Sequence, residues 1–464
     1  MSPSTVVQGA ALNGDVLCVR VEGGVITHVA PRVPGGDVTV DAAGGAVLPG
    51  LHDHHIHLLA LAAARRSVAL GPPAVTDAAG FDRAMRAAAR AGEGWLRGVG
   101  YHESTSGLLD RHRLDALVGD RPARVQHATG AMWVLSSAAL RRTGFDALDH
   151  DGVERDGAGS PTGRCFGLDA HLRAAVPPAP VDLTGVGREL ARFGVTGVTD
   201  LTPTEDGDEM ELLVGAVADG VLPVDVHVTG GLGLSDDVAP TLHRGPVKFV
   251  VGDHRLPPLE ELASGIGAAH RRGRPAAVHC ASLVALVLAL AAWDVAGVRP
   301  GDRVEHGAVI PAELLARLRA LGLVVVTQPS FVRDRGDRYL TDVPAGEHQD
   351  LWRCGSLIAA GVGVAAGSDA PYGDADPWRA IAAATDRRTT AGTVLGPAER
   401  VAAAEALRLY LTDADDPAGP VRRVAVGQPG RLCVLDRPLA DALAAPASSA
   451  VSATVGRSGV VLQP

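Results

Sequence analysis

The chain has 464 residues, of which 46% are apolar and only 3% aromatic, and its formal net charge is −10. That length suits a large domain with a smaller appendage, and the composition favours packed α/β structure over a coiled coil or a lone β-sandwich. The acidic balance argues against nucleic acid and no apolar run reaches the ~18 residues of a membrane span, so we expect neither as a partner.

Both ends of the chain read as short strands. Residues 5–45 alternate apolar and polar positions and break at a Gly-Gly pair, and the segments 430–436 and 451–463 repeat this style. We therefore expect the two ends, residues 1–45 and 419–464, to pair into one small β-sandwich domain.

The first residues show no basic segment followed by an apolar one, so the sequence predicts no signal peptide. The five cysteines are scattered and odd in number, which is typical of a protein in a reducing compartment. We expect a cytoplasmic protein.

The middle of the chain alternates strand-like and helix-like segments. Helical patterns occur at 258–272 and 311–321, and the apolar run 281–293 reads as a buried helix. Eight strands joined by helical crossovers indicate an α/β fold, a (β/α)8 TIM barrel over residues 46–418. The expected strands are 46–51, 195–200, 222–229, 246–251, 276–280, 303–308, 323–329 and 362–367.

Residues from about 60 to 190 do not fit this repeat. They contain strand-like runs of their own near 95–101 and 123–128. We expect a long insertion after the first barrel strand.

A histidine-rich stretch follows the first expected barrel strand, where such barrels hold their chemistry. Two histidines two positions apart on a strand point to the same face, so His55 and His57 can hold one metal ion together. His52 and His54 form a competing pair in the other register, and periodicity alone does not choose between the pairs.

Later strand ends also carry polar side chains. Lys248 lies in the fourth expected strand, His279 ends the fifth, Glu305 and His306 end the sixth, and Asp369 follows the eighth. Alternation turns Glu305 away from the cavity, where it would support the ligands from behind. Candidate ligands at several strand ends together predict a metal site.

The sequence around these candidate ligands resembles that of a known enzyme family. The stretch "LPGLHDHHIHL" with "VEHG" and "GSDAP" resembles the signatures of the amidohydrolase superfamily. The segments "RVQHATGAMWVLSSAAL" and "PTGRCFG" resemble the insertion of the branch that contains N-substituted formamide deformylase and related metal-dependent hydrolases. The resemblance implies the TIM barrel, the register on His55 and His57, and a metal-dependent hydrolase.

The resemblance also implies how the ligands are shared. His55, His57 and Asp369 would bind one divalent metal ion, and His279 and His306 would bind a second. A ligand set without cysteine suits zinc, with manganese, iron and cobalt as open alternatives.

Lys248 is the only lysine in the chain. In many members of the superfamily a lysine carboxylated by CO2 bridges the two ions, and Lys248 stands at the corresponding strand. Carbamate formation requires a neutral amine, which a desolvated lysine can provide and an arginine cannot. The alternatives are an ordinary interior lysine, or a one-metal site in which His306 or Lys248 orients water or substrate.

The implied reaction is hydrolysis of an amide or formamide-like C–N bond of a small molecule by metal-bound hydroxide. Asp369 would accept the proton of the water and pass it to the leaving group. A hydrolytic deaminase, a lactone or ester hydrolase, and a non-catalytic scaffold are the alternatives. A homodimer is an open alternative for the assembly.

Four further side chains are candidate substrate contacts. His102 and Glu103 lie in the insertion motif "YHES", which also reads as a surface loop. Trp133 could cover the cavity or simply fill the core of the insertion, and Gln328 ends the seventh strand, where a polar group can face substrate. His127 reads as a buried structural residue.

Overall fold

The computed structural model describes residues 4–12, 14–177, 181–203, 207–236, 238–252 and 256–463. The chain forms two compact units, unit 1 with residues 1–58 and 183–464, and unit 2 with residues 59–182. The passage from unit 1 into unit 2 falls within helix α1 (Leu58–Arg65).

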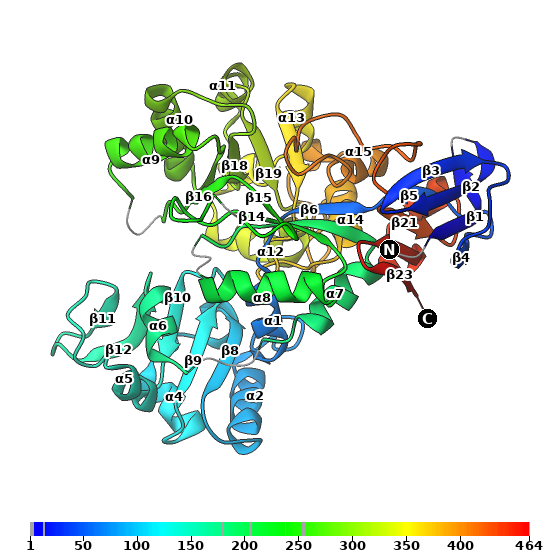
Figure 1. Ribbon diagram of the computed structural model, residues 1–464. Coiled ribbons are helices and arrows are strands. Elements are labelled where there is room, and N and C mark those ends of the chain that lie inside the picture. Colours follow the sequence, from blue (N-terminus) through cyan, green and yellow to red (C-terminus); the bar gives the residue numbers. More distant parts are fainter. Residues whose placement is uncertain are drawn as a thin grey trace. The chain divides into compact units, whose positions relative to one another are not determined.

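Two four-stranded sheets of unit 1 contain the chain ends, which Figure 1 shows in blue and red. In the second sheet β5, from the N-terminal part, pairs antiparallel with β21 from the C-terminal part. The sheets have the orders β3-β2-β1-β4 and β23-β22-β21-β5. Their strands are β1 (Thr5–Leu12), β2 (Asp15–Glu22), β3 (Val25–Ala30), β4 (Val38–Asp41), β5 (Val47–Pro49), β21 (Leu432–Leu435), β22 (Val451–Gly456) and β23 (Gly459–Leu462).

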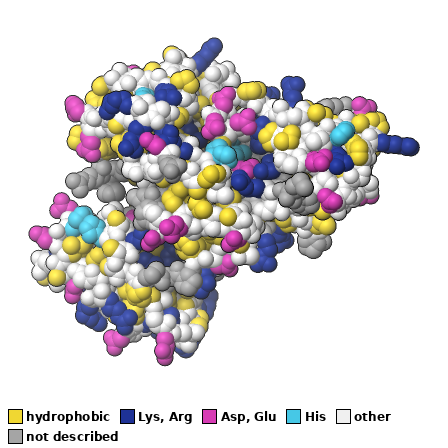
Figure 2. Space-filling model, in the orientation of Figure 1, with side chains coloured by type: hydrophobic (Ala, Val, Ile, Leu, Met, Phe, Trp, Pro, Cys, Tyr) yellow, Lys and Arg dark blue, Asp and Glu magenta, His cyan; other side chains and the backbone are white. Residues whose placement is uncertain are grey.

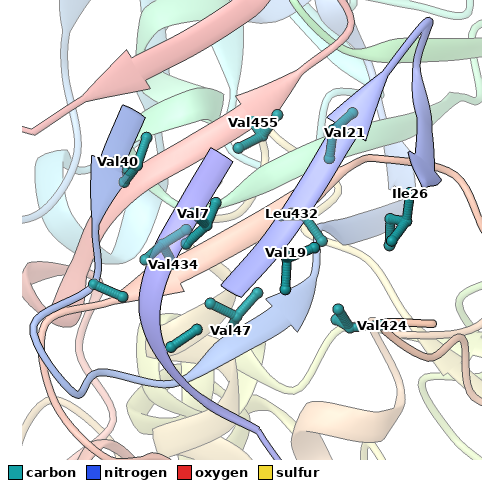
Figure 3. Packing of buried hydrophobic residues seen from close by; sticks show 13 residues of the cluster. Val7, Val19, Val21, Ile26, Val40, Val47, Val424, Leu432, Val434 and Val455 are labelled. Atoms are coloured by element: carbon teal, nitrogen blue, oxygen red, sulfur yellow. The ribbon is translucent and has the colours of Figure 1, made fainter. Parts of the chain in front are cut away.

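One apolar cluster draws side chains from both of these sheets (Figure 3). Val7 and Val19 come from the first sheet, Val434 and Val455 come from the second, and none is more than 5% exposed. Alternation along each strand places these side chains on one face. The two ends of the chain therefore share one hydrophobic core.

The rest of unit 1 alternates parallel strands with helices. Its parallel sheets have the orders β15-β14-β13-β6 and β16-β17-β18-β19-β20. The strands are β6 (Leu51–Ile56), β13 (Val195–Asp200), β14 (Asp225–Val228), β15 (Leu242–Arg244), β16 (Val247–Phe249), β17 (Ala276–Cys280), β18 (Arg303–His306), β19 (Val324–Thr327) and β20 (Gly363–Ala366).

The remaining helices of unit 1 connect or follow these strands. The α-helices are α7 (Leu183–Arg192), α8 (Gly207–Ala218), α9 (Leu259–Arg271), α10 (Leu283–Ala296), α11 (Leu315–Leu321), α12 (Ser330–Asp342), α13 (Gly355–Ala359), α14 (Pro377–Asp386), α15 (Ala403–Arg408) and α16 (Leu439–Ala444). Short 3-10 helices are η1 (Ala312–Leu314), η2 (Ala345–Asp350), η3 (Pro397–Glu399) and η4 (Ser448–Ala450). This mixed α/β content fits a TIM barrel.

Backbone hydrogen bonds link the outer strands of the two parallel sheets. Gly245 N donates to Val228 O at 2.7 Å, and Lys248 N donates to Gly230 O at 3.0 Å, so the chain passes from β14 and β15 into β16 without leaving the hydrogen-bonded layer. At the other side, Ile56 forms a parallel bridge with Ala370 just after β20.

The first expected strand, 46–51, is divided in the structure. Val47–Pro49 belongs to the small sheet with β21, and the parallel strand begins only at Leu51. Gly50 makes this change possible, because a Cβ at that position would lie 2.1 Å from Thr196 Oγ1. His52, His54 and His55 therefore lie within β6, and His57 follows it directly.

The apolar run expected as a buried helix forms α10, which is buried on one side only. Ala285, Leu286 and Trp293 are no more than 1% exposed, whereas Val284 and Val287 are 58% and 48% exposed. The expectation of a buried helix therefore holds for one face of α10 only. Because the sequence of the helix is apolar on all sides, it gives no signal of which face meets solvent.

Unit 2 contains a six-stranded mixed sheet in the order β11-β12-β10-β9-β8-β7. Helices α4 and α5 contact its strands β9, β10 and β12. The strands are β7 (Val68–Ala69), β8 (Leu96–Tyr101), β9 (Ala123–His127), β10 (Met132–Leu135), β11 (Val153–Arg155) and β12 (Pro161–Phe166), and the helices are α2 (Ala78–Arg90), α3 (Glu103–Ser106), α4 (Arg111–Val118), α5 (Ser137–Thr143) and α6 (Asp169–Ala175).

Local sequence explains the best-defined helix of unit 2. Asp77 caps α2 by accepting a hydrogen bond from Gly80 N at 2.6 Å, which satisfies an end amide that the helix itself leaves unpaired. Phe81 and Met85 lie one turn apart and are fully buried in the core of the unit.

Arginine and acidic side chains are interspersed over the face shown in Figure 2. Among the described residues, none of the helices combines the length and hydrophobicity needed to cross a membrane.

Candidate metal centre

His55, His57 and Asp369 converge at the edge where β6 meets the end of β20. Asp369 Oδ1 lies 3.4 Å from His55 Nε2 and 3.3 Å from His57 Nε2. One candidate ligand atom from each of the three residues lies within 4.8 Å of the others, which is close enough for one ion. The structure thus brings together the pair in the register that the family resemblance implies.

His306 joins this group to His279. The ring centroids of His55 and His306 are 4.7 Å apart, and those of His306 and His279 are 4.5 Å apart. His279 and His306 reach each other because β17 and β18 are parallel neighbours. The four histidines therefore form a continuous row of nitrogen donors.

Hydrogen bonds at Nδ1 hold the rings of two of these histidines in place. His55 Nδ1 lies 2.5 Å from Glu305 Oε2, and His306 Nδ1 lies 2.9 Å from Gln328 Oε1. Glu305 is held in turn by Arg303 Nε at 2.6 Å. Such partners are typical of metal-binding histidines, because they leave Nε2 to the ion. Among the described residues, His55 Nε2 is buried without a hydrogen-bond partner.

Glu305 does not point away from the ligands as alternation predicts. His306 has a positive φ of 70°, which takes it out of the extended pleat of β18. Glu305 and its neighbour His306 can therefore both face His55. The expected supporting role of Glu305 agrees with the structure, and its expected direction is wrong.

Two candidate ligands have strained backbones. His306 and Asp369 have φ values of 70° and 53°, each costing about 1–3 kcal/mol in a non-glycine residue. Asp53 Oδ1 accepts hydrogen bonds from His55 N at 3.0 Å and from Ser368 N at 2.9 Å, which ties β6 to the segment before Asp369. Strain that the surroundings hold in place is typical of functional sites.

The electrostatics favour neutral histidines beside an ionised carboxylate. Burial lowers the pKa of His55 to about 4 and that of His306 to about 3. Burial by itself would raise the pKa of Asp369, but the hydrogen bond with His57 and the neighbouring His55 and His306 outweigh it and hold that pKa well below its usual range. Neutral imidazoles and a carboxylate are the protonation states that metals bind.

Lys248 lies in β16 with its side chain inside unit 1. The residue is 6% exposed, and among the described residues its Nζ has no hydrogen-bond partner. Burial lowers the pKa of Lys248, while the charges of Glu305 and Asp369 oppose that shift. An amine that is buried and unpaired loses its proton more readily than a surface lysine does.

The competing pair lies in a different environment. His52 Nε2 contacts Thr199 Oγ1 at 2.9 Å, and His54 Nε2 contacts Thr412 Oγ1 at 3.0 Å. His52 also packs edge-on against His227, with ring centroids 5.6 Å apart. Paired with hydroxyl groups, these side chains belong to a separate buried histidine group.

The histidine group should make folding sensitive to acid. Burial lowers the pKa of His227 to about 3 from an ordinary 6.5, so between these pH values the unfolded chain binds a proton that the folded chain does not. The free energy of unfolding should therefore fall as the pH drops below 6.5, by about 1.4 kcal/mol per pH unit from this side chain. In chemical denaturation between pH 4 and 7, His227→Gln should reduce the slope by that amount. His28→Gln, at an exposed position, is the control, and an unchanged slope in His227→Gln would contradict the assignment.

A comparison with known protein families shows which family this chain belongs to. Residues 38–462 match the amidohydrolase family. The chain belongs to this family. The match covers both the centre around His55 and the lysine-bearing strand, and it confirms the resemblance drawn from the sequence motifs. Family membership makes the protein a hydrolase of carbon–nitrogen bonds.

This amidohydrolase matches its relatives over most of their length. It is 27% identical to the N-substituted formamide deformylase of Arthrobacter pascens, over 92% of this chain and 91% of that one. It is 26% identical to the putative amidohydrolase YtcJ of Bacillus subtilis strain 168, over 79% of each chain. Its fold is similar to that of an uncharacterized metal-dependent hydrolase from Pyrococcus horikoshii OT3, with a TM-score of 0.73, 19% identity and coverage of 94% and 97% of the two chains.

The candidate substrate contacts lie in different surroundings. Trp133 of the amidohydrolase belongs to a core cluster of unit 2 and donates to Asp169 Oδ1 at 2.8 Å. His102 and Glu103 gather with His127 in the same unit. Gln328 lies in unit 1 against His306, and among the described residues its buried Nε2 has no hydrogen-bond partner.

Sequence reasoning missed three supporting roles in this amidohydrolase. Asp53 bridges two backbone segments, Arg303 holds Glu305, and Gln328 orients His306. A buried acidic or basic residue on a strand beside a candidate ligand is the signal that could have found the first two.

Proposed function

We propose that this amidohydrolase is a metal-dependent hydrolase that cleaves an amide or formamide-like C–N bond of a small molecule. The observation that carries the proposal is the buried amine of Lys248 in a centre where His55, His306 and Asp369 converge. A cation-binding function accounts for both the unpaired amine of Lys248 and the unpaired Nε2 of His55 among the described residues. A purely structural role would leave the cost of burying the amine without any compensating interaction.

We infer that the two parallel sheets form one (β/α)8 barrel. The bonds that join β14 to β16 and Ile56 to Ala370 support this reading, because they connect the sheets at both sides. Residues 242–249 then act as one strand, which gives eight in all. The two small sheets that share an apolar core would be the β-sandwich built from both chain ends.

The residues present fit two divalent ions, with zinc as the proposed element. His55, His57 and Asp369 would hold the first, and His279 and His306 would hold the second. Lys248, as a carbamate formed with CO2, would contribute one oxygen to each. Its lowered pKa supports this chemistry, because only the neutral amine reacts with CO2.

When bound, the metal lowers the pKa of a water molecule toward about 7 and polarises a carbonyl oxygen. Asp369 is placed to accept the proton of the attacking water, since its carboxylate is ionised and lies between His55 and His57. It would then deliver that proton to the leaving nitrogen. Glu305 and Gln328 would keep the imidazoles of His55 and His306 in the correct tautomer.

Two observations support the proposed substrate class: the similarity to a formamide deformylase and the hydrogen bond between Gln328 and His306. The relative from Arthrobacter pascens is an N-substituted formamide deformylase, and it matches this chain over nearly its whole length. Gln328 Nε2 would donate to a substrate oxygen, since its own Oε1 is used by His306. We therefore propose a small N-formyl or N-acyl amine as substrate.

Metal removal and a substrate panel test this function. The purified protein should release amine from N-formyl or N-acyl compounds, lose this activity after chelation and regain it with Zn2+. Amine release is followed against a panel that also contains cyclic amides, aminopurines and lactones.

His55→Asn should lose bound metal and activity together, and His28→Gln, at an exposed position, is the matched control. If the protein hydrolysed only aminopurines, the proposed function would change to a hydrolytic deaminase. If it hydrolysed only lactones, the proposed function would change to a lactone hydrolase. Full activity without metal would overturn the proposal itself.

A further inference from the structure

Unit 2 brings together a second set of metal-ligand side chains. Strands β8 and β9 are parallel neighbours, and Tyr101 at the end of β8 lies opposite His127 at the end of β9. His102 and Glu103 follow directly after Tyr101. The carboxyl ends of two adjacent parallel strands thus deliver two imidazoles and a carboxylate to one place.

The three side chains are within reach of a single ion. His127 Nε2 lies 3.0 Å from Glu103 Oε2, and the ring centroids of His127 and His102 are 4.9 Å apart. One ligand atom from each residue lies within 4.8 Å of the others. Neighbouring ligand atoms around tetrahedral zinc are about 3.3 Å apart, so small side-chain rotations would complete the geometry.

Both histidines are anchored in the same way. His102 Nδ1 lies 2.7 Å from Ser104 Oγ, and His127 Nδ1 lies 2.8 Å from Thr129 Oγ1. In each case the hydroxyl belongs to the residue two positions later in the chain. The backbone amides of Ser104 and Thr129 also donate to these Nδ1 atoms, at 3.1 Å and 3.2 Å, so Nε2 carries the proton in the metal-free protein. An ion bound at Nε2 would require that proton to move to Nδ1, where the neighbouring hydroxyl can accept it.

A simple ion pair accounts for only part of this arrangement. A hydrogen bond between His127 and Glu103 explains those two side chains, and the capping of α3 explains the contact of His102 with Ser104. Neither contact requires all three side chains to gather within reach of one ion. The Glu103 side chain is 53% exposed and that of His127 is 10% exposed, so solvent can reach one side of the group. That combination fits three protein ligands with a fourth position for water.

We propose that His102, Glu103 and His127 form a second, independent divalent-metal site in unit 2. Two imidazoles and one carboxylate favour Zn2+ over Mg2+ or Ca2+, which prefer oxygen ligands. Ser104 and Thr129 are positioning residues that hold the two rings. The site shares no residue with the proposed hydrolytic centre, because all of its ligands lie within residues 59–182.

Zinc binding by the full chain tests the proposal. Titration with Zn2+ against a competing chelator should show one equivalent that is lost in Glu103→Gln and retained in Glu93→Gln, another exposed glutamate of unit 2. Glu103→Gln preserves side-chain shape, so its folding should be unaffected. The same Glu103-dependent equivalent should persist in a His55→Asn background, which separates this site from the hydrolytic centre.

Two further measurements distinguish a built site from an ion pair. Ser104→Ala and Thr129→Val should each weaken zinc binding at this site by about 10-fold, as loss of an outer partner does elsewhere. An anomalous difference map at the zinc edge should place a peak about 2.0–2.2 Å from all three ligands. A Glu103→Gln protein that binds as much zinc as the wild type, or a map without this peak, would overturn the proposal.

Discussion

Replacing Lys248 with alanine should remove most of the metal from the hydrolytic centre and lower kcat/KM by at least about 10³-fold. The expected loss exceeds the roughly 10- to 100-fold effect of removing an outer partner of a ligand, because the variant removes the proposed bridge between the ions. The side chain is buried and, among the described residues, unpaired at Nζ, so alanine breaks no hydrogen bond there. Metal content by elemental analysis and kcat/KM are the two measurements.

Arginine at this position separates the carbamate from a simple positive charge. Lys248→Arg keeps the charge, but its guanidinium stays protonated and cannot take up CO2. We expect it to be nearly as inactive as Lys248→Ala, whereas a short carboxylic acid should partly restore the alanine variant by supplying the missing oxygens. Thermal unfolding of both variants serves as the folding control. An arginine variant with full activity would rule out the carbamate.

The candidate ligands could be recognised from the sequence because strand ends carry unusual polar residues. His279 and His306 each end an expected strand and Asp369 follows one, and a parallel sheet brings such positions to one edge. Periodicity left two registers open for the first histidine pair, since a shift of one residue exchanges the faces of a strand. The family motif made that choice, and the contacts of Asp369 with His55 and His57 agree with it.

The orientation of Glu305 could not be predicted from the sequence. Alternation assumes extended backbone, and the positive φ of His306 interrupts it at the end of β18. Nothing in the letters "VEHG" requires that conformation. The division of the first strand at Gly50 has a similar cause, because it depends on the approach of Thr196 from a distant strand.

Residues in the insertion were harder still to assign. Trp133 has the same apolar character in a core as in a lid, and only its hydrogen bond to Asp169 and its burial place it in the core of unit 2. His102, Glu103 and His127 lie in two motifs separated along the chain, so their proximity follows from the pairing of β8 with β9 rather than from any local spacing.

Asp369→Asn should leave the protein folded and lower kcat by about 10²- to 10⁴-fold, the range typical of losing a general acid–base group. Asparagine has nearly the same shape and can keep contacts with His55 and His57, but it cannot accept a proton from water or donate one to the leaving nitrogen. The positive φ at this position also tolerates asparagine better than most residues. Asp415→Asn, at a side chain that is 84% exposed, is the matched control.

Metal content decides how the loss in Asp369→Asn is interpreted. An amide oxygen binds a divalent ion more weakly than a carboxylate does, so the first ion should be partly lost, and kcat is therefore measured with Zn2+ in excess. If proton transfer is the role of Asp369, the defect in kcat persists when the centre is filled. Glu305→Gln, which alters the support of His55 and the ion pair with Arg303 but no proposed proton-transfer group, should instead recover most of its activity under the same conditions. Recovery of normal turnover by Asp369→Asn would assign the proton transfer to another residue.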